Sequence, residues 1–380
     1  MTKFAIITHV PHIVDGKDYF AYGPYVREIN VWTKYADQIL IAAPKKRSEK
    51  SAIDSRYEHP DIEFCEISSF DLLKPGAIIA AFFKIPLISW KIFRTMQKAD
   101  HIHLRCPGNI GLLGVFLQIL FPGKPKTAKY AGNWDPNAKQ PWSYRLQKWI
   151  LSNTFLTRKM QVLVYGNWPG STKSIKPFFT ATYKESDKTA VAPRVFSDTI
   201  KFLFVGTLSI GKRPLYAIQL IERLQQSGYN VSLDFFGEGR ERKNLEDYIS
   251  SKNLENAVRL HGNQNEETVR NAYKNSHFLV LPSQSEGWPK VVAEAMFWGC
   301  IPIATAVSCV PDMIGDGKGI ILKMDPDADI ASITAIMKNE TSCKEISSLG
   351  MKWSRQYTLD VFEAEIRALL TDSKTAENGK

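Results

Sequence analysis

The segment that decides the fold is residues 281–304, which read LPSQSEGWPKVVAEAMFWGCIPIA. A short apolar strand ends at its first residues, and a polar loop containing Gly287 follows. Pro289 suits the first position of a helix, because the missing N–H of proline costs nothing there. Ile301–Thr305 predicts the next strand. The segment therefore reads as a strand, a helix and a strand of one parallel sheet.

The same alternation of short apolar runs and longer amphipathic stretches covers the whole chain and predicts two doubly wound α/β domains. The strands expected in the first half are Phe4–Thr8, Ile39–Ala42, His101–Leu104 and Gln161–Val164. Those expected in the second half are Lys201–Val205, Ser232–Phe236, Val258–Leu260, His277–Leu281 and Ile301–Thr305. Residues 168–200 are rich in proline and lack a helical period, so we place the boundary there, between domains of residues 1–185 and 195–356. Two such sheets facing one another would bind ligands in the cleft between their strand ends.

The excess of positive charge lies in the first half. Of a net charge of +10, residues 1–190 contribute 27 Lys and Arg against 15 Asp and Glu, and residues 191–380 contribute 22 against 24. Such an excess is typical of a solvated surface, but it also suits a face for anionic lipid head groups or a phosphorylated acceptor. No nucleic-acid-binding motif accompanies the basic residues, so no nucleic acid partner is expected.

Two apolar runs test for a membrane span. Residues 76–90 are interrupted by Lys84 and Pro86, whereas a span needs about 20 apolar residues. For this run and for 111–121 we favour a helix lying against the sheet, with a membrane-surface helix as the alternative. The five scattered cysteines show no metal spacing, and the N-terminus does not resemble a signal peptide. These features predict a cytoplasmic protein with reduced thiols. The basic first half and its two apolar runs also suit peripheral contact with an anionic membrane.

The helix expected from Pro289 offers free backbone N–H groups and a positive dipole end, which suit a phosphate. Glu286 precedes this helix, and Glu294 lies roughly 7–8 Å along its axis from Pro289. With a diphosphate at the helix start, one carboxylate can reach the sugar hydroxyls of a nucleotide sugar and the other its ribose hydroxyls. The competing interpretation makes Glu286 a partner of the helix dipole and Glu294 an exposed surface residue.

Three further expected strands end in glycine turns, which read FLFVGTLSIGKRPL (202–215), FFGEGR (235–240) and LHGN (260–263). Glycine also permits a positive φ, so one such turn says little, but three at the strand ends of one sheet indicate a common site. Lys212 and Arg213 in the first turn can neutralise a diphosphate leaving group, or they can be ordinary surface cations.

In this order, these residues resemble the retaining glycosyltransferases of family 4, which have the GT-B fold of two facing Rossmann-like domains. The resemblance covers about residues 201–310 well. It implies that Glu286 contacts the donor sugar, Glu294 the ribose and Lys212 the diphosphate. The further donor-binding residues that it implies are Gly206, Thr207, Arg213, Gly237, Gly262, Asn263, Trp288, Pro289, Lys290 and Val291. Thr207 stands where many relatives have arginine, which leaves the phosphate charge to Lys212 and Arg213.

The first half resembles the family more loosely. YGPYVRE (22–28) resembles its glycine loop, with Gly23 matching, and ADHIHLRCPGN (99–109) resembles the strand whose second histidine faces the reacting sugar. This implies a catalytic role for His103, which Arg105 on the same strand face can assist or replace. Asn133 stands where relatives often carry histidine, and we expect it on the acceptor side with Gly23 and Arg105. The closing helix, about 357–380, is expected to pack on the first domain, as in GT-B relatives.

The resemblance implies a hexosyltransferase, of EC class 2.4, that moves a hexose-type sugar with retention from a UDP- or GDP-linked donor to a glycan or lipid-linked acceptor in surface polysaccharide biosynthesis. The nucleotide sugar is a substrate, and no cofactor or metal is expected. The acidic run from Asp325 to Asp329 lies late and predicts a helix N-cap instead of a metal site. Two alternatives remain open: a non-transferase such as a nucleotide-sugar epimerase, and a basic membrane- or nucleic-acid-binding protein with a vestigial donor site.

Overall fold

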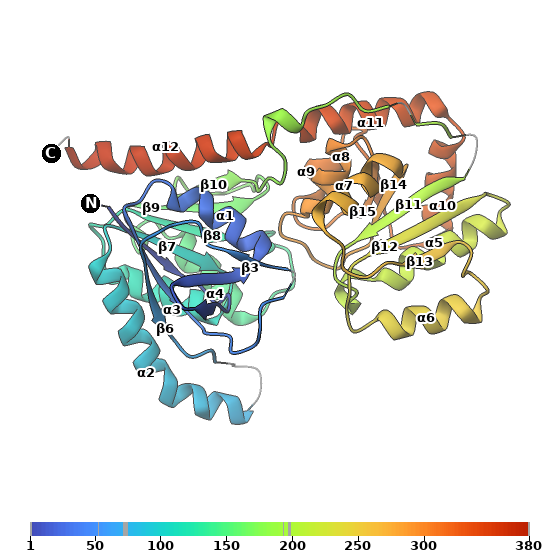
Figure 1. The fold of residues 1–380 in the computed structure, drawn as a ribbon. Coiled ribbons are helices and arrows are strands. Elements are labelled where there is room, and N and C mark those ends of the chain that lie inside the picture. The colour runs from blue at the N-terminus through green and yellow to red at the C-terminus, as the bar shows by residue number, and fades with distance from the viewer. Residues whose placement is uncertain (1, 52, 71–74, 193, 197–198, 379–380) are drawn as a thin grey trace. The chain divides into compact units, whose positions relative to one another are not determined.

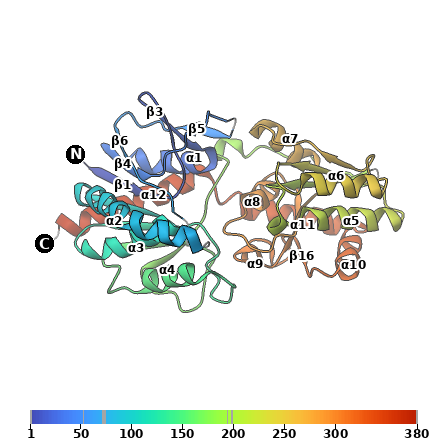
Figure 2. The same cartoon turned by 90° about the horizontal axis from the view of Figure 1, so that it is seen from below.

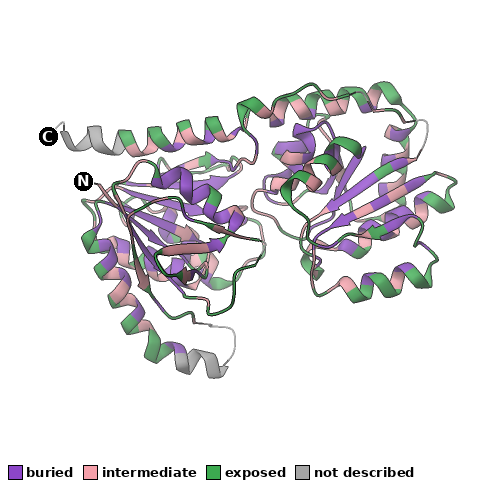
Figure 3. Ribbon diagram, viewed as in Figure 1, coloured by how far each residue is buried: buried purple, intermediate pink, exposed green. Residues whose placement is uncertain are grey.

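The computed structural model describes residues 2–51, 53–70, 75–192, 194–196 and 199–378 (Figure 1). The chain divides into two compact units. Unit 1 comprises residues 1–179 and 362–380, and unit 2 comprises residues 180–361. In both units the buried residues lie on the strands and on the inward faces of the helices (Figure 3).

Among the described residues, unit 1 is built on a seven-stranded parallel sheet of order β10-β9-β8-β7-β1-β4-β6. Its strands are β1 Lys3–Ile7, β4 Gln38–Ala43, β6 Ile62–Glu66, β7 His101–Cys106, β8 Lys126–Tyr130, β9 Met160–Tyr165 and β10 Ile175–Phe178. All four strands predicted for this half are confirmed. Strand β8 was missed because Lys126 and Lys129 make it look polar, yet both are buried. Strand β10 was missed because Pro177 lies in it, which an edge strand tolerates.

Helices α2 Pro75–Lys98, α3 Asn109–Leu117 and α4 Trp142–Ser152 lie side by side on one face of this sheet (Figure 2). Helix α1 Gly23–Thr33, which has Pro24 in its first turn, packs Trp32 on the opposite face. Helix α12 Leu359–Asn378 belongs to unit 1 from Phe362 onward, and the Phe362 ring centroid lies 5.5 Å from that of Phe178. The single turn η1 Gln118–Leu120 follows α3.

A small antiparallel sheet that sequence analysis did not find adjoins α1. It consists of β2 Ile13–Asp15, β3 Asp18–Tyr22 and β5 Asp54–Arg56, in the order β2-β3-β5. These strands are three to five residues long and mixed in polarity, so their pattern does not stand out from that of a loop.

Among the described residues, unit 2 holds a six-stranded parallel sheet of order β13-β12-β11-β14-β15-β16. Its strands are β11 Ile200–Val205, β12 Val231–Phe236, β13 Val258–Leu260, β14 Phe278–Leu281, β15 Ile301–Thr305 and β16 Ile320–Leu322. The five strands predicted here are confirmed, and β16 was missed. The helices are α5 Pro214–Gln226, α6 Arg242–Ser251, α7 Glu266–Asn275, α8 Lys290–Phe297, α9 Val310–Ile314, α10 Pro326–Met337 and α11 Glu340–Ser354, with single turns η2 Glu185–Asp187 and η3 Ile210–Lys212. Asp325 caps α10 as predicted, since its side chain accepts from the N–H groups of Asp327 and Ala328.

The strand order fixes where each sheet can bind a ligand. In unit 2 the order reverses between β11 and β14, and in unit 1 it reverses between β1 and β7. At such a reversal the crossover connections leave in opposite directions, so a crevice opens at the carboxyl ends of the two strands. The candidate site residues that follow these four strands are therefore the ones to consider first.

Candidate functional site

The reversal point of unit 2 brings Lys212 and Glu286 together. Lys212 ends the turn after β11, Glu286 lies in the loop after β14, and the lysine Nζ donates to Glu286 Oε1 at 2.5 Å. The Glu286 side chain is 9% exposed and that of Lys212 29%. The backbone N–H of Gln284 donates to Gly211 O at 2.8 Å and ties the two loops to each other. A cation and a carboxylate thus face one another at the ligand-binding edge of the sheet.

The loop after Glu286 leads directly into helix α8. This helix begins at Lys290, one residue later than expected, with Pro289 at its N-cap and no side chain capping it among the described residues. The carbonyl of Gly287 accepts from Ser308 Oγ at 3.1 Å and from Cys309 Sγ at 3.2 Å, which fixes the loop. A helix start held in this way, with the positive end of the helix dipole and the backbone N–H groups of the first turn, suits an anion.

The Glu294 side chain is fixed by hydrogen bonds, so it is not the freely exposed surface residue of the competing interpretation. Its Oε1 accepts from Thr182 Oγ1 at 2.7 Å, and its Oε2 accepts from the Tyr273 hydroxyl at 2.9 Å. Burial, and after it the Glu294 carboxylate, raise the pKa of Tyr273 well above its usual value, so this hydroxyl stays a donor. Each carboxylate oxygen can accept a further hydrogen bond, so the carboxylate is oriented and still able to bind hydroxyls.

The close packing of the three turns explains why they contain glycine. The N–H of Gly206 donates to Phe236 O at 2.9 Å, and the N–H of Gly237 donates to Gly262 O at 2.8 Å. A Cβ on Gly237, whose φ is +146°, would lie 2.0 Å from Gly206 O. The turns therefore pack backbone against backbone, which brings the three strand ends into one surface.

Replacing Gly237 with alanine is expected to destabilise the protein by about 2–4 kcal/mol, because the backbone must leave its φ region and the turns must part. The measurement is the urea unfolding of the full chain. Gly211→Ala is the matched control, since a Cβ there meets nothing within 4 Å. Equal losses of stability in the two variants would show that the close packing of the turns is unimportant.

The remaining donor-side candidates lie around this edge with different exposure. Thr207 and Asn263 are exposed, whereas Arg213 is half-buried and has a left-handed backbone, with φ 49°. The Trp288 ring stacks on that of Trp353 at 6.0 Å between centroids. Lys290 and Val291 form the first turn of α8.

In unit 1, Arg105 and His9 lie at the point where the strand order reverses. Arg105 was predicted from sequence, whereas His9 was not. Arg105 Nη1 lies 3.4 Å from Glu28 Oε1, and the Arg105 side chain is 15% exposed. His9 follows β1, and burial, then the charge of Arg105, lower its pKa. A Cβ on Gly108, after β7, would lie 2.9 Å from His9 Nδ1, so the ring rests on the glycine. The signal available in the sequence was a histidine directly after the first strand.

The structure places His103 in the core of unit 1. Its side chain has no exposed surface, its Nδ1 hydrogen-bonds Thr127 Oγ1 at 2.9 Å, and its ring lies 4.7 Å from that of Trp32. Burial lowers its pKa to about 3. The ring is neutral and enclosed in this structure, and its contact with a bound sugar stays a prediction. Arg105, two residues on, is the side chain of this strand face that reaches the strand end.

Gly23 and Asn133 also have local structural roles. The N–H of Gly23 donates to Ile53 O at 2.7 Å, and a Cβ on Gly23 would lie 2.7 Å from Ser55 Oγ. Asn133 is buried, and its Oδ1 accepts from the N–H of Asp135 at 2.8 Å. These contacts shape the loops beside the crevice, and any contact of the two residues with an acceptor stays a prediction.

Known proteins share parts of this sequence. The profile of the family described as glycosyl transferases group 1 matches residues 186–353. An uncharacterized glycosyltransferase of Methanocaldococcus jannaschii is 28% identical over 37% of this chain and 39% of its own length. Protein CapJ of Staphylococcus aureus is 23% identical over 83% of this chain and 81% of its length. A Campylobacter jejuni alpha-1,4-N-acetyl-D-galactosaminyltransferase, named for an undecaprenol-diphosphate-linked acceptor, is 24% identical over 50% and 55%. The chain thus spans less than two thirds of the first and third of these relatives.

Solved structures share the fold over the full length. Sucrose-phosphate synthase from Thermosynechococcus elongatus has a TM-score of 0.70 at 15% identity, and the similarity covers 99% of this chain and 100% of that one. Anabaena HepE in complex with UDP-glucose has a TM-score of 0.70 at 14% identity, covering 98% and 100%. These similarities and the two parallel sheets confirm the predicted GT-B fold class, with one Rossmann-like sheet in each unit.

Proposed function

We propose, because residues 186–353 match the glycosyl transferases group 1 family, that the protein is a retaining glycosyltransferase. It moves a hexose-type sugar from a UDP- or GDP-linked donor to a glycan or lipid-linked acceptor in surface polysaccharide biosynthesis. The observation that supports this most is the pairing of Lys212 with Glu286 beside the N-terminus of α8. A diphosphate, a sugar and a ribose each find matching groups along this edge of unit 2.

In the proposed reaction the donor diphosphate lies between Lys212 and the first N–H groups of α8. The bond between the anomeric carbon and the diphosphate oxygen breaks, and the acceptor oxygen bonds to that carbon on the same face. The acceptor proton passes to the leaving diphosphate. Lys212 and the helix dipole neutralise the developing charge, so this mechanism needs no metal. Glu286 accepts from sugar hydroxyls and Glu294 from ribose hydroxyls.

The names of two relatives support the choice of substrates. Anabaena HepE was solved in complex with UDP-glucose, and the Campylobacter jejuni enzyme is named for an acceptor linked to undecaprenol diphosphate. For this chain we therefore propose a uridine-nucleotide sugar as the first donor to test and a diphosphate-linked lipid as the first acceptor.

A panel of UDP- and GDP-sugars tests the donor. A nucleotide sugar that binds only the folded protein stabilises it by about 2.7 kcal/mol at 100 times its Kd, so one donor is expected to raise the Tm and to be cleaved slowly without acceptor. Isomerised sugar with no released nucleotide would favour the epimerase alternative. A panel that neither shifts the Tm nor releases nucleotide would reject transferase activity.

The helical layer of unit 1 supports contact with a membrane. Large apolar side chains of α2, α4 and the turn after α4 are exposed on it, namely Phe82, Phe83, Leu87, Trp90, Trp142, Trp149 and Phe155. Phe82 and Phe83 are 75% and 76% exposed. Cations stand among them, with the Arg94 guanidinium 5.7 Å from the Trp90 ring and that of Arg158 4.7 Å from Phe155. No helix within the described residues is long and apolar enough to cross a bilayer. We propose that this layer rests on an anionic membrane at its cytoplasmic face.

The triple substitution Phe82→Ser, Phe83→Ser and Trp90→Ser is expected to weaken binding to phosphatidylglycerol vesicles about tenfold or more, because each exposed ring loses its burial in the lipid interface. Cosedimentation with vesicles measures this binding. Leu349→Ser, at an exposed position of α11 in unit 2, is the control. Undiminished cosedimentation of the triple variant would exclude this layer as the contact surface.

A further inference from the structure

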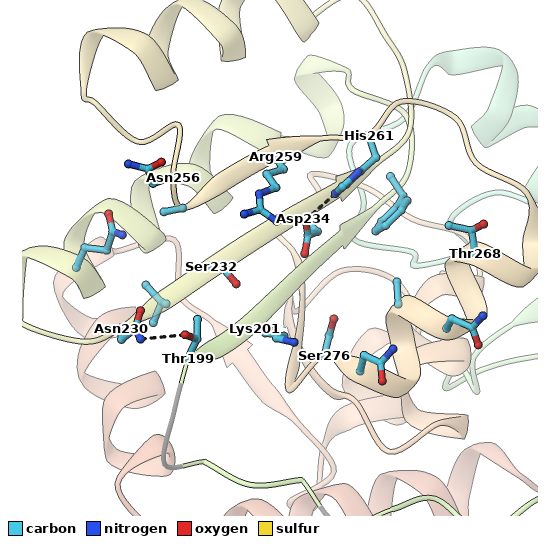
Figure 4. A pocket seen from close by; sticks show the side chains of 17 residues that line it. Thr199, Lys201, Asn230, Ser232, Asp234, Asn256, Arg259, His261, Thr268 and Ser276 are labelled. Atoms are coloured by element: carbon cyan, nitrogen blue, oxygen red, sulfur yellow. Dashed lines mark hydrogen bonds and ion pairs between the residues drawn. The ribbon is translucent and has the colours of Figure 1, made fainter.

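A groove of about 660 Å³ lies on one face of the sheet in unit 2 (Figure 4). Helix α7, which precedes β14, packs beside β11 on this face of the sheet. Helices α5 and α6 pack on the opposite face. Strands β12 and β13 therefore present one face without a helix over it in the described part of the chain. The floor of the groove is formed by alternate residues of these strands, such as Ser232, Asp234 and Arg259.

The groove is separate from the candidate donor site. It follows the strands from Thr199 and Asn230 at their amino ends to Phe236 and His261 at their carboxyl ends. Lys212, Glu286 and Glu294 do not line it. A ligand along the floor therefore occupies the face of the sheet, whereas the donor loops stand at its edge.

The lining of the groove is rich in short groups that both donate and accept hydrogen bonds. Its five amide side chains are Gln225, Asn230, Asn256, Asn271 and Asn275. Asn271 and Asn275 lie one turn apart on the same side of α7. Serine and threonine hydroxyls add to them, and glutamate is absent from the lining. An amide offers two donors and an acceptor that can bind neighbouring hydroxyls of a sugar ring.

The charge of the groove is positive on balance. Lys201 and Arg259 rise from the floor, and Asp234 is the one carboxylate among the lining residues. Asp234 Oδ1 is engaged by His261 Nε2 at 2.6 Å, and the His261 ring stacks on Phe236 with 4.7 Å between centroids. An anionic group on the ligand would meet two cations.

We propose that this groove is a second carbohydrate-binding site, which takes an acidic oligosaccharide outside the transfer site. The amides and hydroxyls bind the ring hydroxyls, and Lys201 and Arg259 bind the carboxylates of uronic acid units. The volume falls within the range of about 300–1,000 Å³ that is usual for small-ligand sites. The choice of a glycan as the occupant rests on the proposed function. Such a site would retain a growing acidic glycan near the enzyme between transfers.

The full-length protein is titrated calorimetrically with a hyaluronan tetrasaccharide, which alternates glucuronic acid and N-acetylglucosamine, and with the neutral N-acetylglucosamine tetramer. The acidic probe is expected to bind more tightly than the neutral one and to weaken as salt rises. The double variant Lys201→Gln and Arg259→Gln is expected to lose at least about fivefold in affinity. Lys243→Gln, which removes an exposed lysine of α6, is expected to bind as the unaltered protein does.

The nucleotide of the donor sugar that raises the Tm most, added at saturation, separates this site from the donor site. If the acidic probe still binds with that nucleotide present, and binds the double variant more weakly, the groove is the second site. Displacement by that nucleotide, equal binding by the double variant, or no binding of either probe would each overturn the inference. The Tm shift produced by nucleotide sugars is measured on the same samples. A Tm shift with a donor but no binding of the tetrasaccharide would refute only the second site. The absence of a Tm shift with every donor would refute the proposed function.

Discussion

Replacing Lys212 with glutamine is expected to lower kcat for sugar transfer about 10²–10³-fold, the loss usual when one group that stabilises developing negative charge is removed. Lys212 Nζ lies 2.5 Å from Glu286 at the reversal point of unit 2, so without ligand the carboxylate holds the ammonium where a leaving diphosphate would need it. Single-turnover release of nucleotide measures the chemical step directly. The Kd of the nucleotide is expected to rise much less than kcat falls.

Two further variants separate this role from a structural one. Lys212→Arg keeps the positive charge and is expected to recover part of the rate, whereas a purely steric role would not be rescued. Lys252→Gln breaks another lysine–glutamate pair of unit 2, with Glu222 at 3.4 Å, and is expected to leave kcat unchanged. A Lys212→Gln enzyme with normal turnover would remove the lysine from the mechanism.

Much of the fold was predictable from sequence because parallel strands buried on both faces read as apolar runs. This is why β11, β12, β14 and β15 were found within about a residue of their ends. Strands whose burial depends on distant partners were not found. Lys129 is buried because its Nζ donates to Phe179 O at 2.9 Å and its charge lies over the Phe178 ring. No local pattern predicts such a lysine.

The candidate site also has contacts that sequence could predict and contacts that it could not. That Lys212 and Glu286 meet follows from topology, because loops after the two strands at a reversal point lie together wherever they stand in the sequence. The partners of Glu294 could not be predicted, since Tyr273 lies on another helix and Thr182 within the expected boundary segment. The burial of His103 could not be predicted either, because nothing near it in the sequence shows that Trp32 of α1 covers its ring.

The buried histidines of β7 are expected to make unit 1 unstable in acid. His101 and His103 are 5% and 0% exposed, both hydrogen-bond Thr127 Oγ1, and burial lowers the pKa of each to about 3. In the unfolded chain they titrate near pH 6.5, so between pH 6.5 and about 3 the unfolded state binds more protons. Above pH 6.5 this titration does not change the free energy of unfolding. Below pH 6.5 the free energy of unfolding falls by about 1.4 kcal/mol per pH unit for each histidine.

The pH slope of stability, not its absolute value, tests this expectation, because any substitution in a core also changes packing. Urea unfolding of the unaltered protein and of His103→Leu is compared from pH 7 to 4.5. The difference in unfolding free energy between them is expected to shift by about 2.7 kcal/mol in favour of the variant over the two units below pH 6.5. Carboxylates titrate equally in both proteins and cancel. Parallel pH profiles would show that His103 is protonated in the folded state and reaches solvent, as its predicted role at the sugar requires.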